Sequence, residues 1–316
     1  MSIGRWLMGA GVLVAAGAAG EYALARYFMR RTLIRSNAKR ERTQDMSGTN
    51  WGNYIPTIRA SKERRAAFPQ EDVYITSFDG LQLHGTWFPY EESDRTVICF
   101  HGYTSEGMND YSTIAEYYRE NRFNLLLVDE RAHGKSEGKY IGFGCLDRRD
   151  ARSWIDYVIS RVGESSQIML HGISMGGSTV LMTSGLELPE QVKGIISDCA
   201  FTSAWAVFSS VLKVTYHLPS FPMMHISDWM TRREAGYGLK ECNAREEVKK
   251  SKTPTVFIHG DADTFVPFSM VHELYEACAA PKKLVVIQGA GHAEACYKEP
   301  ELYEKAIGDW IARYFE

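Results

Sequence analysis

The chain contains His171-Gly172-Ile173-Ser174-Met175-Gly176-Gly177, in which the pattern G-x-S-x-G surrounds Ser174. Residues 167–170, directly before it, predict a short buried strand, and residues 176–186 predict a helix rich in small residues. At a sharp turn from strand to helix, a serine hydroxyl is pushed out of the sheet and lies above the helix N-terminus. Side chains at positions 172 and 176 would collide with neighbouring elements there, which explains the glycines. The stretch therefore predicts a nucleophile elbow at Ser174.

On both sides of this stretch, short apolar segments alternate with helical patterns. Helices are predicted over residues 147–161 and 300–314, whose apolar residues recur at helical spacing. Asp79-Gly80 joins two alternating runs, over residues 72–78 and 81–88, and predicts a hairpin. The alternation predicts an α/β fold with a mostly parallel sheet and helices on both faces. Its buried strands are expected at residues 96–100, 124–128, 167–170, 194–197, 255–258 and 284–287.

One interval breaks the alternation, because residues 204–251 are longer than a simple crossover between two strands requires. An insertion at the carboxyl side of the sheet is expected to cover the active site as a small lid. Some of its large apolar side chains should line a groove over Ser174, or else they pack the insertion onto the core. These side chains are Trp205, Phe208, Tyr216, Phe221, Met223, Met224 and Trp229.

A serine nucleophile needs a base, and the base needs a carboxylate that fixes its tautomer. We expect His292 to be the base, because it lies in a glycine-bearing loop after the last predicted strand. Asp261 and Asp263, which follow the preceding strand, compete for the acid, and Asp198 after another strand is a third option. His101, His171 and His259 each precede a glycine at a strand end, where we expect them to shape loops.

The oxyanion that forms during acyl transfer needs two preorganised N–H donors. The first expected donor is the backbone N–H of Met175, directly after the nucleophile. The second is expected from the loop after residues 96–100, where Gly102 permits close approach and the N–H of Tyr103 follows.

Composition excludes several classes of function. The chain has 316 residues and a formal net charge of -3, so no overall positive field attracts nucleic acid. Its six cysteines are scattered, without a C-x-x-C pair or metal-ligand spacing, and indicate neither a disulfide framework nor a zinc site. Nothing in the sequence predicts a cofactor or a metal, and the oligomeric state is left open.

The N-terminus differs from the rest of the chain, because residues 6–20 carry no charge. A membrane anchor over residues 6–29, a signal peptide cleaved near Ala16-Gly17-Ala18, an interfacial helix and an ordinary packed helix all fit this pattern. Arg5 alone precedes the run, whereas seven Lys and Arg follow it between Arg26 and Arg42. Such an asymmetry favours an anchor with the enzyme in the cytoplasm; secretion after cleavage is the alternative.

Three regions are therefore expected: an anchor or signal-like segment over residues 1–29, a basic linker over residues 30–70, and a catalytic domain over residues 71–316 with its lid at about residues 204–251.

Taken together, these motifs resemble the α/β-hydrolase family over residues 72–316. Ser174, Asp263 and His292 follow the family's order of nucleophile, acid and base, and residues 260–267 resemble its G-x-x-D-x-x-V-P motif, which favours Asp263 as the acid. Residues 129–138 resemble its D-x-R-G-H-G-x-S-x-G loop, with Ala132 in place of a glycine. Within the family, the chain is most similar to serine aminopeptidase-like and cinnamoyl-esterase-like members, and to membrane-anchored bacterial ones.

The resemblance implies an eight-stranded α/β-hydrolase fold and a metal-independent serine hydrolase. Its expected substrate is a small carboxylic ester or other acyl compound, cleaved through an acyl-enzyme. An acyl-aminoacyl or prolyl-type peptidase, a thioesterase and an acyltransferase are alternatives, because the subgroups share motifs but not substrates. A catalytically silent binding module at the membrane is the alternative from a different class.

Overall fold

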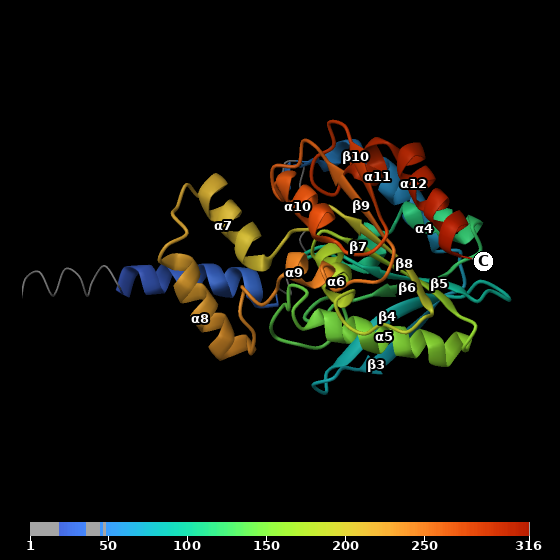
Figure 1. The fold of residues 1–316 in the computed structure, drawn as a ribbon, viewed down its shortest axis with the longest axis horizontal. Helices are drawn as coiled ribbons and strands as arrows, with labels where there is room; N and C mark the ends of the chain where they lie inside the picture. The colour runs from blue at the N-terminus through green and yellow to red at the C-terminus, as the bar shows by residue number, and fades with distance from the viewer. Residues whose placement is uncertain (1–18, 36–44, 47–48, 316) are drawn as a thin grey trace, which may run out of the picture.

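The computed structural model describes residues 19–35, 45–46 and 49–315, and its centre is an eight-stranded sheet (Figure 1). The strand order is β10-β9-β8-β7-β5-β6-β4-β3. Only β4 runs in the opposite direction to the other strands of this sheet, so the predicted mostly parallel sheet with an antiparallel edge is confirmed. The strands are β3 (Glu71–Thr76), β4 (Gln82–Phe88), β5 (Arg95–Phe100), β6 (Asn124–Val128), β7 (Gln167–Ile173), β8 (Val192–Asp198), β9 (Thr255–Gly260) and β10 (Lys282–Ile287).

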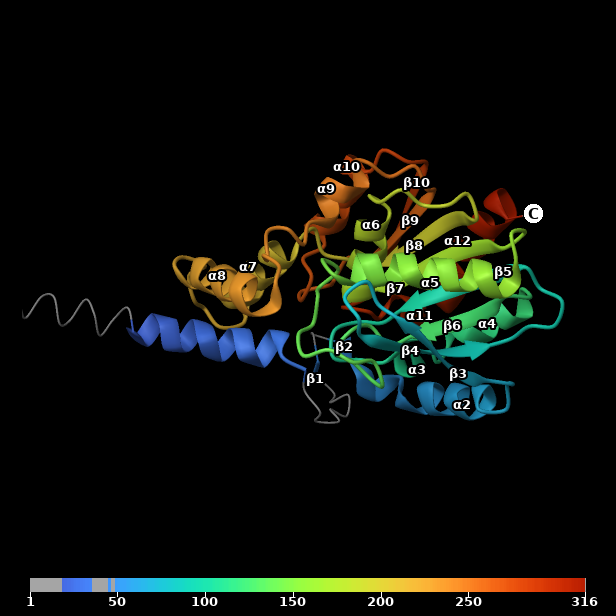
Figure 2. The same cartoon turned by 90° about the horizontal axis from the view of Figure 1, so that it is seen from below.

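Helices cover both faces of the sheet because alternate residues of each buried strand point to opposite sides. In β5, Ile98 and Phe100 belong to one hydrophobic core, and Val97 and Cys99 belong to the other. The first core is covered by α5 (Asp147–Val162), α6 (Met175–Thr183) and α10 (Ser269–Ala277). The second is covered by α4 (Ile114–Glu120), α11 (Ala295–Lys298) and α12 (Pro300–Tyr314), on the opposite side (Figure 2).

The turn from β7 to α6 has the tightest backbone packing around the predicted nucleophile. A Cβ at Gly172 would lie 2.1 Å from the carbonyl oxygen of Gly176, and one at Gly176 would lie 2.0 Å from that of Phe100. Between them, Ser174 adopts a φ of 57°, which is strained for a residue with a side chain. The two glycines are therefore necessary for helix α6 to start directly behind the sheet.

Outside the sheet, a helix over residues 19–33 lies beside α7 (Ala204–Val214) and α8 (Met223–Ala235) (Figures 1 and 2). Its buried residues Ala25, Met29 and Leu33 are spaced by four and form one face of the helix. The chain then pairs with the loop after β6, where Ile141 N–H donates to Leu33 O at 2.8 Å. We call residues 19–33 and 204–243 the cap; the short helix α9 (Ala244–Val248) leads from it back to the sheet.

The segment between the cap helix and the sheet is more structured than the predicted linker. It contains β1 (Asp45–Met46), β2 (Thr49–Asn50), the 3-10 helix η1 (Trp51–Asn53) and α2 (Ile55–Arg65). Polar contacts hold α2 in place: Arg65 is buried and donates to Met108 O, and Lys62 donates to the side chain of Asn109. Apolar periodicity does not reveal such a helix, because distant polar partners stabilise it.

Within the described residues, no helix has the length and apolar character that crossing a bilayer requires. Residues 1–18 lie outside the described residues, and with them most of the expected anchor and the possible cleavage site at Ala16-Gly17-Ala18. The part of the expected anchor that the structure describes, residues 19–29, belongs to the cap helix.

We predict that Gly176→Ala destabilises the fold by at least about 3 kcal/mol, because the added methyl group meets backbone that cannot move aside. Denaturant unfolding measures this loss. Gly20→Ala is the matched control, since a Cβ there meets no atom within 4 Å and alanine favours the helix. Equal unfolding midpoints for the two variants would contradict the close packing at Gly176.

Candidate active site

The predicted triad residues come from three loops at the carboxyl ends of strands in the same half of the sheet. Ser174 follows β7, Asp263 follows β9 and His292 follows β10. The Oγ of Ser174 lies 2.8 Å from Nε2 of His292, and Nδ1 of His292 lies 2.7 Å from Oδ2 of Asp263. The fold thus brings the three side chains into one hydrogen-bonded chain, all of them largely buried.

Asp263 is fixed on both of its carboxylate oxygens. Oδ1 accepts the backbone N–H groups of Phe265 and Val266, each at 2.9 Å, and Oδ2 lies 3.1 Å from Nε2 of His259. Burial alone would raise the pKa of Asp263, but His292 and His259 outweigh burial and hold the pKa well below its ordinary range. The carboxylate therefore stays charged beside the imidazole of His292.

The two competing aspartates have other partners. Asp261 is exposed and accepts the N–H of Gly289 at 2.6 Å. Asp198 is buried and accepts the hydroxyl of Tyr303 at 3.1 Å, and burial raises its pKa to about 6. Of the three candidates, the structure therefore brings Asp263 into hydrogen-bonding distance of His292.

The loop that carries His292 is supported by the segment before the sheet, a role that the sequence did not indicate. Thr49 Oγ1 donates to the carbonyl oxygen of His292 at 2.8 Å. The carboxylate of Glu294 accepts the N–H of Gly291 and the hydroxyl of Tyr54, each at 2.6 Å. Thr49 and Tyr54 lie about 240 positions before His292 and Glu294 in the sequence, so only the fold could reveal these two contacts.

The imidazole of His292 is poised to take up a proton. Burial lowers its pKa, but the charge of Asp263 and the hydrogen bond to it outweigh burial, so the pKa lies above the ordinary 6.5. Asp263 therefore stabilises the imidazolium that would form when Ser174 loses its proton.

The two expected oxyanion donors lie near the nucleophile. Met175 begins α6, Tyr103 follows β5, and both line the same cavity as Ser174. A Cβ at Gly102 would lie only 3.6 Å from Cβ of Ser174, which shows how closely this loop approaches. Because β5 and β7 are adjacent in the sheet, the order of strand connections reverses here, and ligand sites of open α/β sheets occur at such points.

Residues 129–138, the loop in which Ala132 stands in place of a glycine, support the loop that carries Tyr103. His133 Nε2 accepts the N–H of Thr104 at 3.2 Å, and burial lowers the pKa of His133 to about 3, which keeps it a neutral acceptor. Ala132 adopts a φ of 63°, a conformation that costs alanine more than the glycine that the resembling motif has there.

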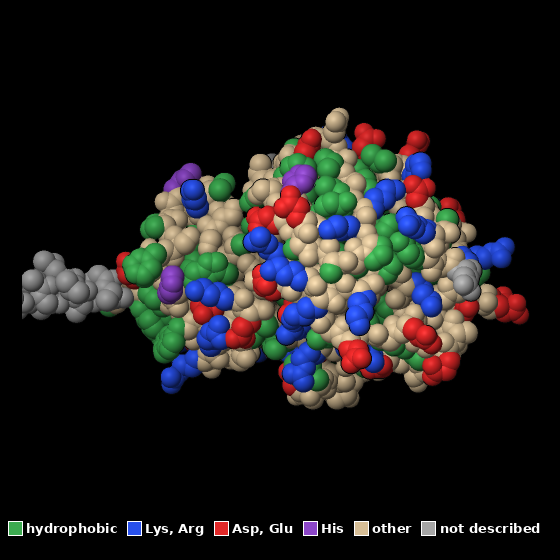
Figure 3. Space-filling model, in the orientation of Figure 1, with side chains coloured by type: hydrophobic (Ala, Val, Ile, Leu, Met, Phe, Trp, Pro, Cys, Tyr) green, Lys and Arg blue, Asp and Glu red, His purple; other side chains and the backbone are tan. Residues whose placement is uncertain are grey.

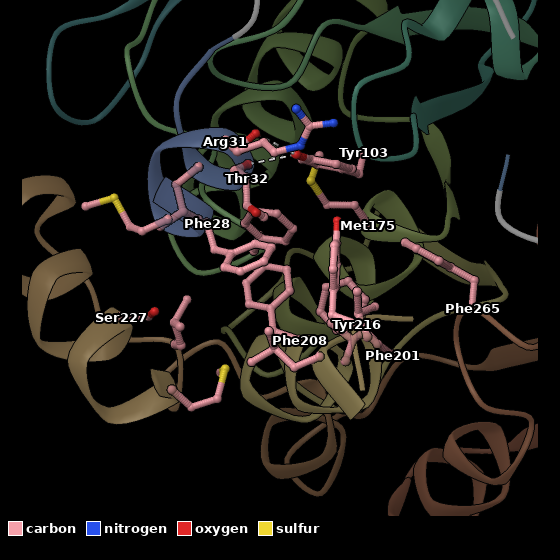
Figure 4. Close-up of a pocket in the computed structure, with 18 of the residues that line it drawn as sticks. Phe28, Arg31, Thr32, Tyr103, Met175, Phe201, Phe208, Tyr216, Ser227 and Phe265 are labelled. Carbon is pink, nitrogen blue, oxygen red and sulfur yellow. Dashed lines mark hydrogen bonds between the residues drawn. The ribbon is translucent and has the colours of Figure 1, made fainter. Parts of the chain in front are cut away.

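An apolar cavity of about 250 Å³ opens beside Ser174 (Figure 4). Four of the large lid side chains line it: Phe208, Tyr216, Met223 and Met224. Trp205, Phe221 and Trp229 do not line it, and the last two are exposed. The sequence did not reveal the remaining wall, which includes Phe28, Met29, Thr32 and Leu33 of the cap helix and Phe143, Phe201 and Phe265.

The cap helix is attached to the predicted oxyanion loop. The hydroxyl of Tyr103 donates to Thr32 O at 3.0 Å (Figure 4). The ring of Tyr103 packs on that of Phe143, with 5.4 Å between the centroids. In the described part of the chain, no group of three or more His, Cys, Asp or Glu side chains has the arrangement of a metal site.

The fold is shared with known hydrolases. Residues 91–235 match the family model described as serine aminopeptidase, S33, and residues 230–315 match the model of the dienelactone hydrolase family. The chain therefore has the α/β-hydrolase fold and is similar to both of these hydrolase families over the matched residues.

Its relatives extend over most of its length. It is 27% identical to the uncharacterized protein YqkD of Bacillus subtilis over 75% of this chain and 77% of that one. It is 28% identical to the uncharacterized protein YfhR of Escherichia coli K12, over 76% of this chain and 80% of that one. Among solved structures, the esterase Pf2001 of Pyrococcus furiosus is 25% identical with a TM-score of 0.66, covering 80% of this chain and 94% of that one.

We predict that kcat/KM for a neutral ester rises with pH through a midpoint above 6.5, because His292 must be neutral to accept the proton and its pKa is raised. Asp263→Asn removes the charge but keeps the burial, so the midpoint should shift to lower pH while kcat falls sharply. The pH profiles of both enzymes measure this. A midpoint that stays in place in Asp263→Asn would show that another group titrates.

Proposed function

We propose that this protein hydrolyses carboxylic esters with Ser174 as the nucleophile, through an acyl-enzyme. The observation that carries the proposal is the hydrogen-bonded chain from Ser174 through His292 to Asp263, placed beside an apolar cavity. The similarity to the esterase Pf2001 of Pyrococcus furiosus supports the same class of reaction.

The proposed reaction has two halves. In the first, His292 takes the proton of Ser174, Oγ attacks the ester carbonyl carbon, and the leaving alcohol departs with the proton from His292. In the second, His292 takes a proton from water, the hydroxide adds to the acyl carbon, and the carboxylic acid leaves as Ser174 regains its proton. The N–H groups of Tyr103 and Met175 stabilise the oxyanion in both halves.

The cavity lining favours an ester over a peptide with a free amino terminus. Of the described residues that line it, Arg31 is the only charged one, and none carries a carboxylate that would bind an ammonium group. The lining favours uncharged, apolar acyl groups, and Met223 and Met224 fit irregular shapes because their side chains are flexible. Acyl-aminoacyl or prolyl peptide, thioester and acyl-transfer reactions use the same groups and remain the alternative reactions.

We predict that Ser174→Ala loses on the order of a millionfold in kcat while the fold persists, because the small side chain still fits the turn. Hydrolysis of a series of neutral p-nitrophenyl esters and labelling with a fluorophosphonate measure the loss. An aminoacyl-arylamide serves as the peptidase control. A variant with a tenth of the original esterase activity would remove Ser174 from the mechanism, and intact protein that never reacts with the label would favour a binding module.

We also propose that the N-terminal segment attaches the enzyme to a membrane with the catalytic domain in the cytoplasm. Seven Lys and Arg between Arg26 and Arg42, against Arg5 alone before the uncharged run, support this orientation. Cell fractionation with protease protection should find the chain in the membrane fraction with its domain on the cytoplasmic side. A mature chain outside the cell that begins near Glu21 would establish a cleaved signal peptide instead.

A further inference from the structure

The cap exposes most of the large hydrophobic side chains on the described surface. Eleven such side chains are exposed in the described residues, and seven of them lie on the cap. Figure 3 shows hydrophobic side chains on the face of the cap that is turned to the viewer. Phe221 is 72% exposed, Tyr27 56% and Trp229 53%, whereas monomeric proteins rarely gather such residues on one surface. The seven are Tyr22, Leu24, Tyr27, Val214, Tyr216, Phe221 and Trp229.

The charge of the cap differs from that of the whole chain. The cap carries seven Lys and Arg side chains against four Asp and Glu, although the chain as a whole has a net charge of -3. Arg26, Arg30 and Arg31 are exposed on the cap helix, and Lys213 and Arg233 are exposed on α7 and α8. Exposed aromatic rings together with cationic side chains are the combination that binds at the headgroup level of an anionic bilayer.

This surface is continuous with the wall of the cavity. The rings of Phe28 and Tyr216 meet at 4.8 Å between centroids, which joins the cap helix to the loop after α7. Both residues line the cavity, and Tyr216 is also 44% exposed. Tyr27, on the outside of the same helix, contacts Phe28 at 5.5 Å. The side chain of Tyr216 therefore reaches from the cavity to the outer surface of the cap.

We propose that the cap docks on an anionic lipid surface and that the enzyme takes its substrate, a lipid ester with a long acyl chain, directly from that surface. The acyl chain enters between the cap helix and α7–α8 and lies along the apolar lining, with its ester carbonyl at Ser174. The substrate class rests on the proposed function, whereas the docking does not. A lipid surface fits better than a second copy of the chain, because the uncharged residues 6–20 precede the cap helix in the sequence and the exposed rings share the cap with exposed cationic side chains, of which Arg233 lies over the ring of Trp229.

The docking is tested with a fluorescent probe, because all six native cysteines are buried and a new surface cysteine can be labelled selectively. The full-length chain carries Phe221→Cys on the cap or Leu302→Cys on α12, a 42% exposed position away from the cap. With vesicles that contain phosphatidylserine, an environment-sensitive label at position 221 should brighten and shift to the blue, and one at position 302 should not. The response should weaken with phosphatidylcholine alone.

This measurement reports docking of the cap however the N-terminus is attached. No response at position 221, or equal responses at both positions, would overturn the proposal. A fluorescence response that increases with protein concentration in the absence of vesicles would show that the cap binds a second copy of the chain. That result would also overturn the proposal.

The substrate class is tested with the double variant Phe221→Ser/Trp229→Ser, whose residues do not line the cavity. Hydrolysis of a long-chain lipid ester in anionic vesicles should fall by about tenfold, equivalent to about 1.4 kcal/mol, while kcat/KM for a short soluble ester stays unchanged. Leu302→Ser should change neither rate. An unchanged ratio of the two rates in the double variant would overturn the lipid-ester proposal.

The failure of the proposed function gives a different pattern. If the unmodified enzyme cleaves neither ester, ester hydrolysis is wrong, and the lipid-ester substrate falls with it. The probe at position 221 still decides whether the cap docks on lipid.

Discussion

The structure depends on the close packing of backbone around Ser174. The carbonyl oxygens of Phe100 and Gly176 occupy the space that side chains at positions 176 and 172 would need, so strand β7 turns into helix α6 within one residue. The turn forces Ser174 into a strained conformation and places its hydroxyl 2.8 Å from His292. Strain of this kind persists only where the surrounding structure overdetermines it, and here two buried hydrophobic cores do so.

Asp263 connects the geometry of the site to its electrostatics. Two backbone N–H groups and His259 hold the carboxylate, so its charge lies in a fixed position next to His292. Burial would otherwise keep the imidazole neutral, as it does for His171, whose pKa falls to about 3. The pKa values of these two buried histidines differ because a carboxylate lies next to His292. The raised pKa makes His292 suitable as a base.

The cap links the start of the chain to the chemistry. Its helix over residues 19–33 supplies part of the cavity wall and accepts the hydroxyl of Tyr103 from the predicted oxyanion loop. The segment that follows supports the His292 loop through Thr49 and Tyr54. Residues that resemble a leader and a linker in the sequence are thus in contact with the active site on two sides.

The sequence by itself determined the elements whose signals are local. Strand β6 and helix α12 have the predicted bounds, because continuous apolar runs and helical spacing reflect burial directly. The glycines at positions 172 and 176, and the spacing of Ser174, Asp263 and His292, indicated which strand ends meet. The tertiary structure decided what depends on distant partners. Helix α2 is held by polar contacts. The carboxylate of Asp263 contacts His292, whereas that of Asp261 contacts the backbone of Gly289. Phe28 lines the cavity although it lies 146 positions before Ser174. Only the folded chain brings these groups together, because a contact between remote segments has no periodicity in the sequence.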